Sequence, residues 1–360
     1  MTTLDELPLR DDLRGQTPYG APQAHVPVSL NVNENTHPIP EAVALDIVER
    51  VAKAITGLNR YPDREFTDLR VALAGYLGHG LTAANIWAAN GSNEVLQHVL
   101  QAFGGPGRTA LGFAPTYSMY RLLASGTGTA WIGAERDADF ELSAATAVAQ
   151  INQHDPDIVF LCAPNNPTGT PLGIDVIEAV ADAARGIVVV DEAYIEFADP
   201  GAASALTLLG GRPRLVVSRT MSKAFAFAGA RVGYLAGDPT TIDALRLVRL
   251  PYHLSALTQA AALGALAHTP AMLAMVDDIR AQRERISTEL AAMGFHPYRS
   301  NANFVLFGGV ADPHVTFQAL FDQGILIRDI GLPGCLRVTA GTEAETSAFL
   351  NAIAKLAPGA

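Results

Sequence analysis

The chain has 360 residues, which fits two domains of about 100–200 residues each better than one small module. Hydrophobic residues make up 49% of it and charged residues 17%, so intrinsic disorder is excluded as its main state. The net charge of −11 disfavours nucleic acid and anionic membranes as main partners.

Cysteine content and hydropathy indicate a cytoplasmic protein. The two cysteines, Cys162 and Cys335, form no CxxC pair, which argues against a disulfide framework or a cysteine zinc site. The first residues carry acids where a signal peptide needs an apolar run, and no uncharged apolar stretch reaches the ~18–20 residues of a membrane span. The nine histidines show no HxxxH or HxH spacing, so no metal site is expected.

Residues 1–40 are rich in Pro, Asn and Thr and are expected to form an N-terminal arm. Helically spaced apolar residues then predict helices over 46–55 and 66–77. Farther on, apolar β-rich runs alternate with helical stretches. The predicted strands are 86–90, 109–114, 129–133, 157–163, 186–193, 214–220 and 231–237, and the predicted helices are 92–103, 143–153, 173–185 and 239–249.

Most of these β-rich runs are continuously apolar, which is typical of strands covered on both faces. Their alternation with helices predicts an α/β large domain over residues 41–250, in which helices cover a mostly parallel seven-stranded sheet. A smaller α+β C-terminal domain is predicted over residues 251–360. Its predicted elements are a helical stretch over 258–293 in two pieces broken near Pro270, strands over 302–308, 324–329 and 336–341, and helices over 313–323 and 343–356.

Four polar segments follow predicted strands, at the edge where open α/β sheets bind ligands. They are ANGSNE (89–94), PNNPTG (164–169), DEAY (191–194) and SRTMSKAFAFAGARVGY (218–234). Each has a plainer explanation: a helix N-cap, a turn, a solvated carboxylate at Asp191, and a surface lysine at Lys223. Their occurrence together in one sheet favours a shared site.

This set of segments resembles the fold-type-I enzymes that use pyridoxal 5'-phosphate, and within them the histidinol-phosphate aminotransferases. The resemblance covers nearly the whole chain. Its further markers are LRGQTPYG (13–20), NVNEN (31–35), RYPD (60–63), PTYSMY (115–120), ILIRD (325–329) and LRVTAGT (336–342). Two positions depart from the family pattern, because Thr36 replaces a proline of the arm motif and Asn93 replaces an acid of the phosphate loop.

The resemblance assigns the catalytic groups. Lys223 supplies the primary amine that holds the cofactor and then shuttles a proton, which a lowered pKa would favour. Asp191 pairs with the cofactor's ring nitrogen and keeps it protonated. Asn166 and Tyr194 hydrogen-bond the phenolic oxygen of the ring.

The resemblance also implies a phosphate cradle at a helix N-terminus, where free N–H groups and the helix dipole favour anions. The residues assigned to it are Gly91, Ser92, Asn93, Thr220, Ser222 and Arg231. Tyr117 is expected to stack on the cofactor ring, with a core aromatic as the alternative. Tyr61 is expected to reach the phosphate from a partner subunit, which implies a homodimer with shared active sites.

For the substrate, Arg337 corresponds to the family's anion-binding arginine, and a planar guanidinium gives two parallel contacts to carboxylate or phosphate. Arg328 and Tyr19 are expected beside it, Tyr252 is expected to face the imidazole ring, and a substrate contact of Asn93 stays open. The alternative for Arg328 is an ordinary surface ion pair. His253 is interpreted as structural, because Lys223 already supplies acid–base chemistry.

The implied activity is the aminotransferase step of histidine biosynthesis, between histidinol phosphate and 2-oxoglutarate, with glutamate as a product. An aromatic amino-acid aminotransferase is the nearest alternative. A PLP-binding regulatory domain needs an attached DNA-binding module, for which residues 1–40 are too short and too polar. A decarboxylase stays open, since the cofactor does the difficult chemistry in all of these proteins.

Overall fold

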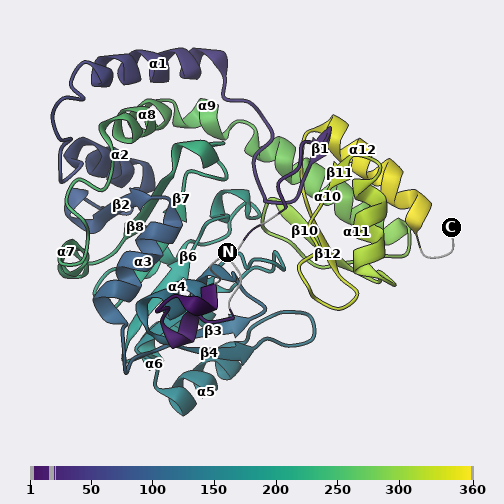
Figure 1. Cartoon of the computed structure of the whole chain (residues 1–360), viewed down its shortest axis with the longest axis horizontal. Coiled ribbons are helices and arrows are strands. Elements are labelled where there is room, and N and C mark those ends of the chain that lie inside the picture. Colours follow the sequence, from purple (N-terminus) through teal and green to yellow (C-terminus); the bar gives the residue numbers. More distant parts are fainter. Residues whose placement is uncertain (1–3, 16–19, 21, 358–360) are drawn as a thin grey trace.

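The computed structural model describes residues 4–15, 20 and 22–357. Its largest sheet has seven strands in the order β2-β8-β7-β6-β5-β3-β4 (Figure 1). Five neighbouring strands run parallel, and β8 is antiparallel to both β7 and β2. The strands are β2 (Ile86–Asn90), β3 (Thr109–Ala114), β4 (Ala130–Glu135), β5 (Ile158–Cys162), β6 (Ile187–Asp191), β7 (Leu215–Thr220) and β8 (Val232–Ala236).

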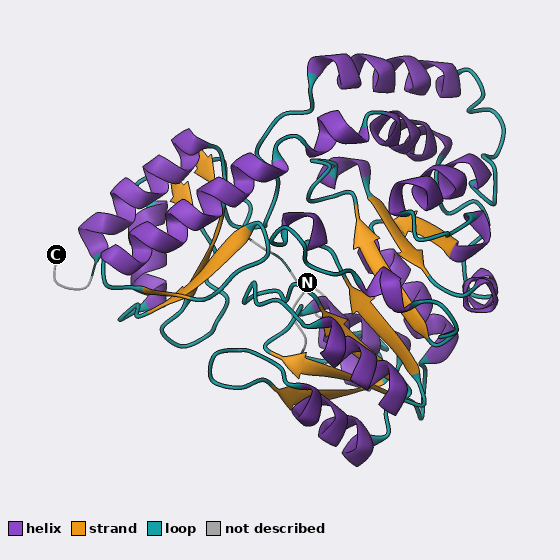
Figure 2. Cartoon of the chain, turned by 180° about the vertical axis from the view of Figure 1, so that it is seen from behind, coloured by secondary structure: helices purple, strands orange, loops and turns teal. Residues whose placement is uncertain are grey.

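Helices pack against this sheet and bury its strands. Every residue of β5, β6, β7 and β8 is buried, as the continuous apolar runs predicted. Helix α3 packs on β2, β7 and β8, while α5 and α6 pack on each other (Figure 2). The helices of this part are α1 (Glu41–Ile55), α2 (Thr67–Leu77), α3 (Ser92–Phe103), α4 (Met119–Thr127), α5 (Ala144–His154), α6 (Ile174–Ala183) and α7 (Pro239–Arg246). Helix α4 has no counterpart in the sequence prediction.

The prediction that the helical stretch over 258–293 is divided into two pieces is wrong, because the structure has three helices there. They are α8 (Ala256–Ala267), α9 (Thr269–Leu273) and α10 (Val276–Ala292). Pro270 stands in the first turn of α9, where its missing N–H costs nothing, so it begins a new helix. Helix α8 packs on α1 and α2 rather than on the C-terminal elements, and the domain boundary at residue 250 stays a prediction.

A second, antiparallel sheet lies apart from the first in both views, with strand order β12-β10-β9 (Figures 1 and 2). Helix α10 packs on β9, β10 and α12. A separate parallel pair joins β1 of the N-terminal segment to β11. The elements are β1 (Val28–Ser29), β9 (His296–Pro297), β10 (Phe304–Gly308), β11 (Ile325–Leu326), β12 (Leu336–Thr339), α11 (Pro313–Phe321) and α12 (Glu343–Ile353).

No single helix of the described segments is long and apolar enough to cross a membrane. One pair, Ala256–Ala267 with Thr269–Ala292, meets the length and composition only together, across a bend of 83°.

Candidate active site

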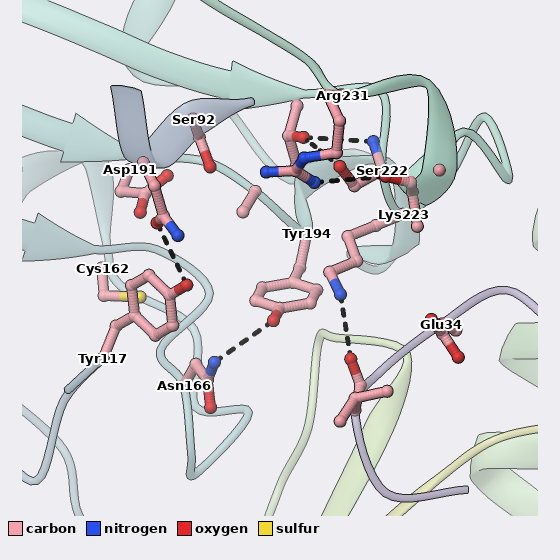
Figure 3. A pocket seen from close by; sticks show the side chains of 16 residues that line it. Glu34, Ser92, Tyr117, Cys162, Asn166, Asp191, Tyr194, Ser222, Lys223 and Arg231 are labelled. Carbon is pink, nitrogen blue, oxygen red and sulfur yellow. Dashed lines mark hydrogen bonds between the residues drawn. The ribbon is translucent and has the colours of Figure 1, made fainter. Parts of the chain in front are cut away.

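A cavity of about 360 Å³ opens where β5, β6 and β7 end (Figure 3). Chain segments far apart in sequence meet there, as expected at the carboxyl edge of a parallel sheet. The lining residues are Val32, Glu34, Ser92, Asn93, Tyr117, Cys162, Asn166, Asp191, Ala193, Tyr194, Thr220, Ser222, Lys223, Ala228, Gly229 and Arg231. Ten of the residues predicted for the site are therefore among those that the structure brings together.

Lys223 follows β7 and is partly buried, with its Nζ donating to the Val32 backbone oxygen at 3.0 Å. Burial and the positive charge of Arg337 together lower the pKa of this amine to about 8, against the effect of Glu34. A larger share of the amine is therefore neutral near pH 7 than for an exposed lysine. A neutral amine is the form that attacks a carbonyl group.

Asp191 is the last residue of β6 and is buried. Its Oδ2 accepts a hydrogen bond of 2.8 Å from the Tyr120 hydroxyl, while Oδ1 is buried without a hydrogen-bond partner among the described residues. Burial raises the pKa of Asp191 to about 6, against the effect of the Tyr120 hydrogen bond. The carboxylate is therefore largely ionised at neutral pH, with one oxygen left for a protonated nitrogen.

The Tyr194 hydroxyl lies between two amides. It accepts from Asn166 Nδ2 at 3.2 Å and from Asn33 Nδ2 at 3.0 Å. A phenol oxygen has two acceptor sites and one proton, so both acceptor sites are filled and the proton is left for an acceptor in the cavity. This suits an oxyanion on a bound ring.

Helix α3 begins at Ser92, directly after Gly91, and Ser92 and Asn93 of its first turn line the cavity together with Ser222 and Arg231. Gly91 has φ +85°, and a Cβ atom there would lie 2.3 Å from Arg231 Nη2. Only glycine lets the guanidinium approach the turn so closely. On the neighbouring strand end, Thr220 Oγ1 donates to Ser222 Oγ at 2.9 Å. The arrangement is an anion cradle.

Two arginines line an adjoining cavity of about 210 Å³, which shares Lys223 and Tyr194 with the first. Arg337 is buried, with Nη1 donating to Asn166 Oδ1 at 2.6 Å and Nη2 to the Asn31 backbone oxygen at 2.9 Å. Arg328 lies beside it through a backbone β-bridge, in which each N–H donates to the other residue's oxygen at 2.9 Å. A bound molecule can therefore extend from Lys223 to both guanidinium groups.

Tyr117 lines both cavities, and its hydroxyl donates to Asn93 Oδ1 at 3.1 Å. Tyr61 and Tyr252 do not line either cavity. They stack on each other, with ring centroids 4.4 Å apart, and Tyr61 is 80% exposed. Their predicted contacts with cofactor and substrate stay predictions. Tyr19 lies outside the described residues.

His253 has contacts that fit the structural role expected for it. Its Nε2 lies 2.9 Å from the Ala88 backbone oxygen, and its ring stacks on Trp87. Sequence reasoning assigned no role to Asn33 or Tyr120, which contact Tyr194 and Asp191 directly. Both stand in segments that carried the family resemblance, NVNEN and PTYSMY, so their position in these motifs placed them near the site without indicating which residue they contact.

Residues 26–353 match the family model of aminotransferase class I and II. Histidinol-phosphate aminotransferase of Paenarthrobacter aurescens (strain TC1) is 64% identical over 99% of this chain and 96% of its own length. The chain belongs to the histidinol-phosphate aminotransferases of class I and II. The protein of that name from Thermobifida fusca (strain YX) is 57% identical to this aminotransferase over 98% of the chain and 96% of the relative.

Solved structures agree with the fold of this aminotransferase. Histidinol-phosphate aminotransferase from Sinorhizobium meliloti, solved in complex with pyridoxal-5'-phosphate, has a TM-score of 0.83 and 26% identity over 92% of this chain and 91% of that one. Aspartate aminotransferase from Thermus thermophilus with maleate has a TM-score of 0.78 over 91% of this chain and 92% of that one, at 22% identity. The predicted α/β fold with a mostly parallel seven-stranded sheet is confirmed.

Proposed function

We propose that this protein transfers an amino group between histidinol phosphate and 2-oxoglutarate with pyridoxal 5'-phosphate as cofactor. One observation carries the proposal. The Lys223 amine and the Asp191 carboxylate face one cavity, and the N-terminus of α3 with Arg231 lies at one end of it. The amine can bind an aldehyde, the buried acid can pair with a pyridine nitrogen, and the anion cradle can bind a phosphate. Pyridoxal phosphate carries all three of these groups.

The residues present fit this cofactor. Asp191 Oδ1 lacks a partner that a protonated ring nitrogen would supply, and the close approach of Arg231 to Gly91 forms the cradle for its phosphate. Ser92 and Ser222 would donate to that phosphate, Thr220 would hold the Ser222 hydroxyl in place through its hydrogen bond, and Tyr117 would lie against the ring. When bound, pyridoxal phosphate withdraws electrons from the substrate's Cα–N unit and carries the amino group between the two half-reactions.

Lys223 then has two tasks at one atom. Its Nζ would hold the bound cofactor, and once the substrate amine had taken its place the same Nζ would accept a proton from the substrate's Cα and give it back within the cavity. An amine with a pKa of about 8 serves as base and as acid near neutral pH. Asn166 and Asn33 would hold the Tyr194 hydroxyl in place to orient the ring of a bound cofactor.

Substrate choice is proposed to rest on the two arginines. Histidinol phosphate presents a phosphate where an amino acid presents a carboxylate, and two guanidinium groups suit nearly two negative charges. Arg337 is fixed by Asn166 and Asn31. The Arg328 side chain forms no ion pair within the described part of the chain, which argues against the surface-pair alternative. Glutamate and 2-oxoglutarate would place their α-carboxylate at Arg337.

A homodimer with shared sites is proposed from an exposed apolar surface. Helix α1 buries Val43 and packs on α8, yet its other face exposes Leu45, Val48 and Ile55. A helix that is apolar on opposite faces is usually covered on both. Figure 1 shows α1 at the edge of the molecule, where a second copy has access.

Cytoplasmic location is also proposed, since both cysteines are free thiols.

The test compares kcat/KM for histidinol phosphate and for phenylalanine, each with 2-oxoglutarate as acceptor. The proposal expects a clear preference for histidinol phosphate. A preference for phenylalanine would instead assign the protein to the aromatic amino-acid aminotransferases. Release of carbon dioxide without formation of glutamate from an amino-acid substrate would indicate a decarboxylase.

A further inference from the structure

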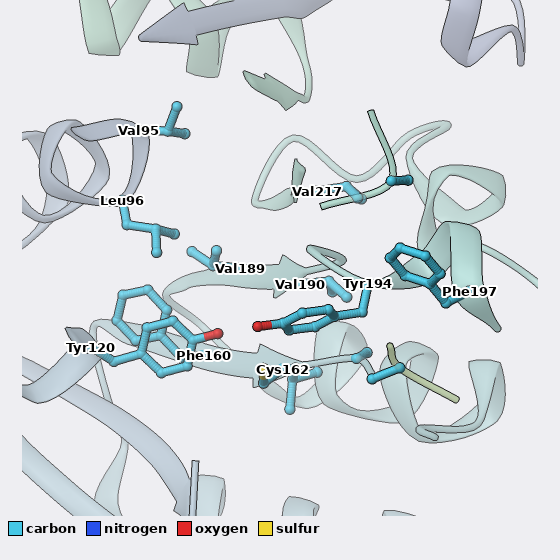
Figure 4. Packing of buried hydrophobic residues seen from close by; sticks show 14 of the residues in the cluster. Val95, Leu96, Tyr120, Phe160, Cys162, Val189, Val190, Tyr194, Phe197 and Val217 are labelled. Carbon is cyan, nitrogen blue, oxygen red and sulfur yellow. The ribbon is translucent and has the colours of Figure 1, made fainter. Parts of the chain in front are cut away.

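Tyr120 lies behind the Asp191 carboxylate and does not line the cavity. It belongs to α4 and is fully buried, with its hydroxyl donating to Asp191 Oδ2 at 2.8 Å. One face of its ring stacks on Phe160, with centroids 4.7 Å apart and an angle of 9° between the planes (Figure 4). The Tyr117 ring packs edge-on against it, with centroids 5.4 Å apart. These contacts fix the direction of the hydroxyl.

Apart from the Tyr120 hydrogen bond, two features of the surroundings of Asp191 favour its protonated form. Burial favours the protonated form of a carboxyl group, and the neighbouring Glu192 carboxylate acts in the same direction. Among the groups that lower the pKa of Asp191, the Tyr120 hydroxyl has the largest effect.

Two other weak acids lie next to this carboxylate. Burial raises the pKa of the Cys162 thiol to about 12 and that of the Tyr120 hydroxyl well above its usual range. Both therefore stay protonated near neutral pH. Asp191 carries the negative charge of this buried group of three, and Tyr120 is placed to donate to it.

We propose that Tyr120 is a positioning residue for transamination, which keeps the Asp191 carboxylate ionised and turns its Oδ1 toward the cavity. The inference rests on the proposed function, because Asp191 acts only when pyridoxal phosphate is bound. Without the Tyr120 hydroxyl, Asp191 Oδ1 takes the proton of the ring nitrogen, so that an ion pair becomes a neutral pair. One N–H bond is lost and one O–H bond forms, and no other bond changes.

The test is the Tyr120→Phe variant, reconstituted with ¹⁵N-labelled pyridoxal phosphate. The ¹⁵N chemical shift reports whether the ring nitrogen holds its proton. In the variant it should move toward the value of unprotonated pyridine, and kcat should fall about tenfold to a hundredfold, as for one lost hydrogen bond to a charged group. The KM for histidinol phosphate should change little, because Tyr120 does not line the cavity.

The matched control is Tyr234→Phe. Tyr234 is a buried tyrosine on β8, and its hydroxyl lies near Arg219 and makes no hydrogen bond to Asp191. This variant should keep the wild-type ¹⁵N shift and kcat. If it shows the same changes as Tyr120→Phe, the effect is general loosening of the core and the proposal is overturned.

A second variant keeps the proposal testable if Tyr120→Phe does not fold. Replacing Tyr120 by 3-fluorotyrosine retains the ring and makes the hydroxyl a stronger donor. The ¹⁵N shift should then move the opposite way, toward the fully protonated value. Wild-type shifts in whichever of these variants fold would refute the role of Tyr120. If instead the unsubstituted protein neither binds pyridoxal phosphate nor transaminates histidinol phosphate, the proposed function itself fails.

Discussion

The low pKa of Lys223 sets the pH at which cofactor-free protein captures pyridoxal phosphate. The attacking form is the neutral amine, which is populated above the pKa. The rate of capture should therefore rise with pH around a midpoint of about 8, and not near the 10.5 of an ordinary lysine. Stopped-flow absorbance at a series of pH values measures this midpoint.

Lys223→Ala is the control for that experiment. It should hold the cofactor without a covalent bond, so that mass spectrometry after borohydride reduction finds no adduct at any pH. An adduct on this variant would show that another amine binds the cofactor. A midpoint above about pH 10 in the unsubstituted protein would contradict the effect of burial on Lys223.

Arg328 and Arg337 should differ in what they recognise. A hydrogen bond to a charged group contributes roughly 1.5–3 kcal/mol, so Arg328→Gln should lower kcat/KM for histidinol phosphate about tenfold to a hundredfold. The loss for glutamate should be smaller, because Arg337 alone can bind a carboxylate with both nitrogens. Steady-state kinetics with both substrates on the same variant gives the ratio.

Arg299→Gln serves as the control for charge loss, since Arg299 is exposed and lines neither of the two cavities described for the site. It should leave both substrates unaffected. Equal losses for histidinol phosphate and glutamate in Arg328→Gln would make Arg328 a scaffold residue rather than a phosphate ligand.

Most residues of the site were predictable, because they stand at fixed places in motifs at strand ends. Lys223, Asp191 and Arg231 are such residues, and all three line the cavity. Tyr120 was not predictable in its role, because its bond to Asp191 joins positions 71 residues apart and depends on how α4 packs. The stacking of Tyr61 on Tyr252 likewise depends on two loops that the sequence does not bring together.

The turn between β2 and α3 requires glycine at position 91. Gly91 has φ +85° and ψ 164°, a region that only glycine adopts without strain of about 1–3 kcal/mol. Gly91→Ala would also push its Cβ into Arg231, 2.3 Å from Nη2. The variant should bind pyridoxal phosphate at least about tenfold more weakly, as for the loss of one hydrogen bond to a charged group. Equilibrium titration of the cofactor-free protein measures this affinity.

Gly75→Ala is the matched control, because Gly75 lies within α2 and, apart from the helix's own backbone, no atom stands within 4 Å of a Cβ added there. It should keep wild-type affinity and unfold at the same or a slightly higher temperature, as alanine favours helix. Unchanged cofactor affinity in Gly91→Ala would mean that Arg231 does not depend on this turn.

The strands of the large sheet were predicted more completely than the helices. The β-rich runs identified every strand of the large sheet, and continuous apolar character marks the strands that are buried on both faces, whereas the edge strand β4 is largely half-buried or exposed. The same pattern does not distinguish β8, the antiparallel strand, from its parallel neighbours. Helix α4 was missed because it has only nine residues and ends in Ser125, Gly126 and Thr127, which are poor helix formers. Helix α9 was merged with its neighbours because five residues give too little periodicity.

For the whole molecule, the shared-site proposal predicts complementation between subunits. Lys223→Ala and Tyr61→Ala should each be nearly inactive as pure homodimers. Mixing them under conditions of subunit exchange should restore activity, because a hybrid dimer has one site with both Lys223 and a partner Tyr61. Activity assays after exchange, with mass spectrometry of the hybrid, measure the recovery.

The control is a mixture of Lys223→Ala with Asp191→Asn. Both changes fall in the same chain's cavity, so a hybrid of these two variants has no intact site whichever subunit supplies Tyr61. Recovery in this mixture, or none with Tyr61→Ala despite confirmed exchange, would show that Tyr61 does not act across the interface.

The pairing of β1 with β11 has a consequence for the order of events during synthesis. Val28 and Ser29 pair with residues almost 300 positions later, Ile325 and Leu326. The segment just after β1 supplies the backbone oxygens that accept from Lys223 and Arg337. The large sheet therefore emerges from the ribosome well before β11 is made, so the segment after β1 docks late. Contacts so distant in sequence also form slowly. The growing chain thus completes its reaction centre only after its last strands have emerged.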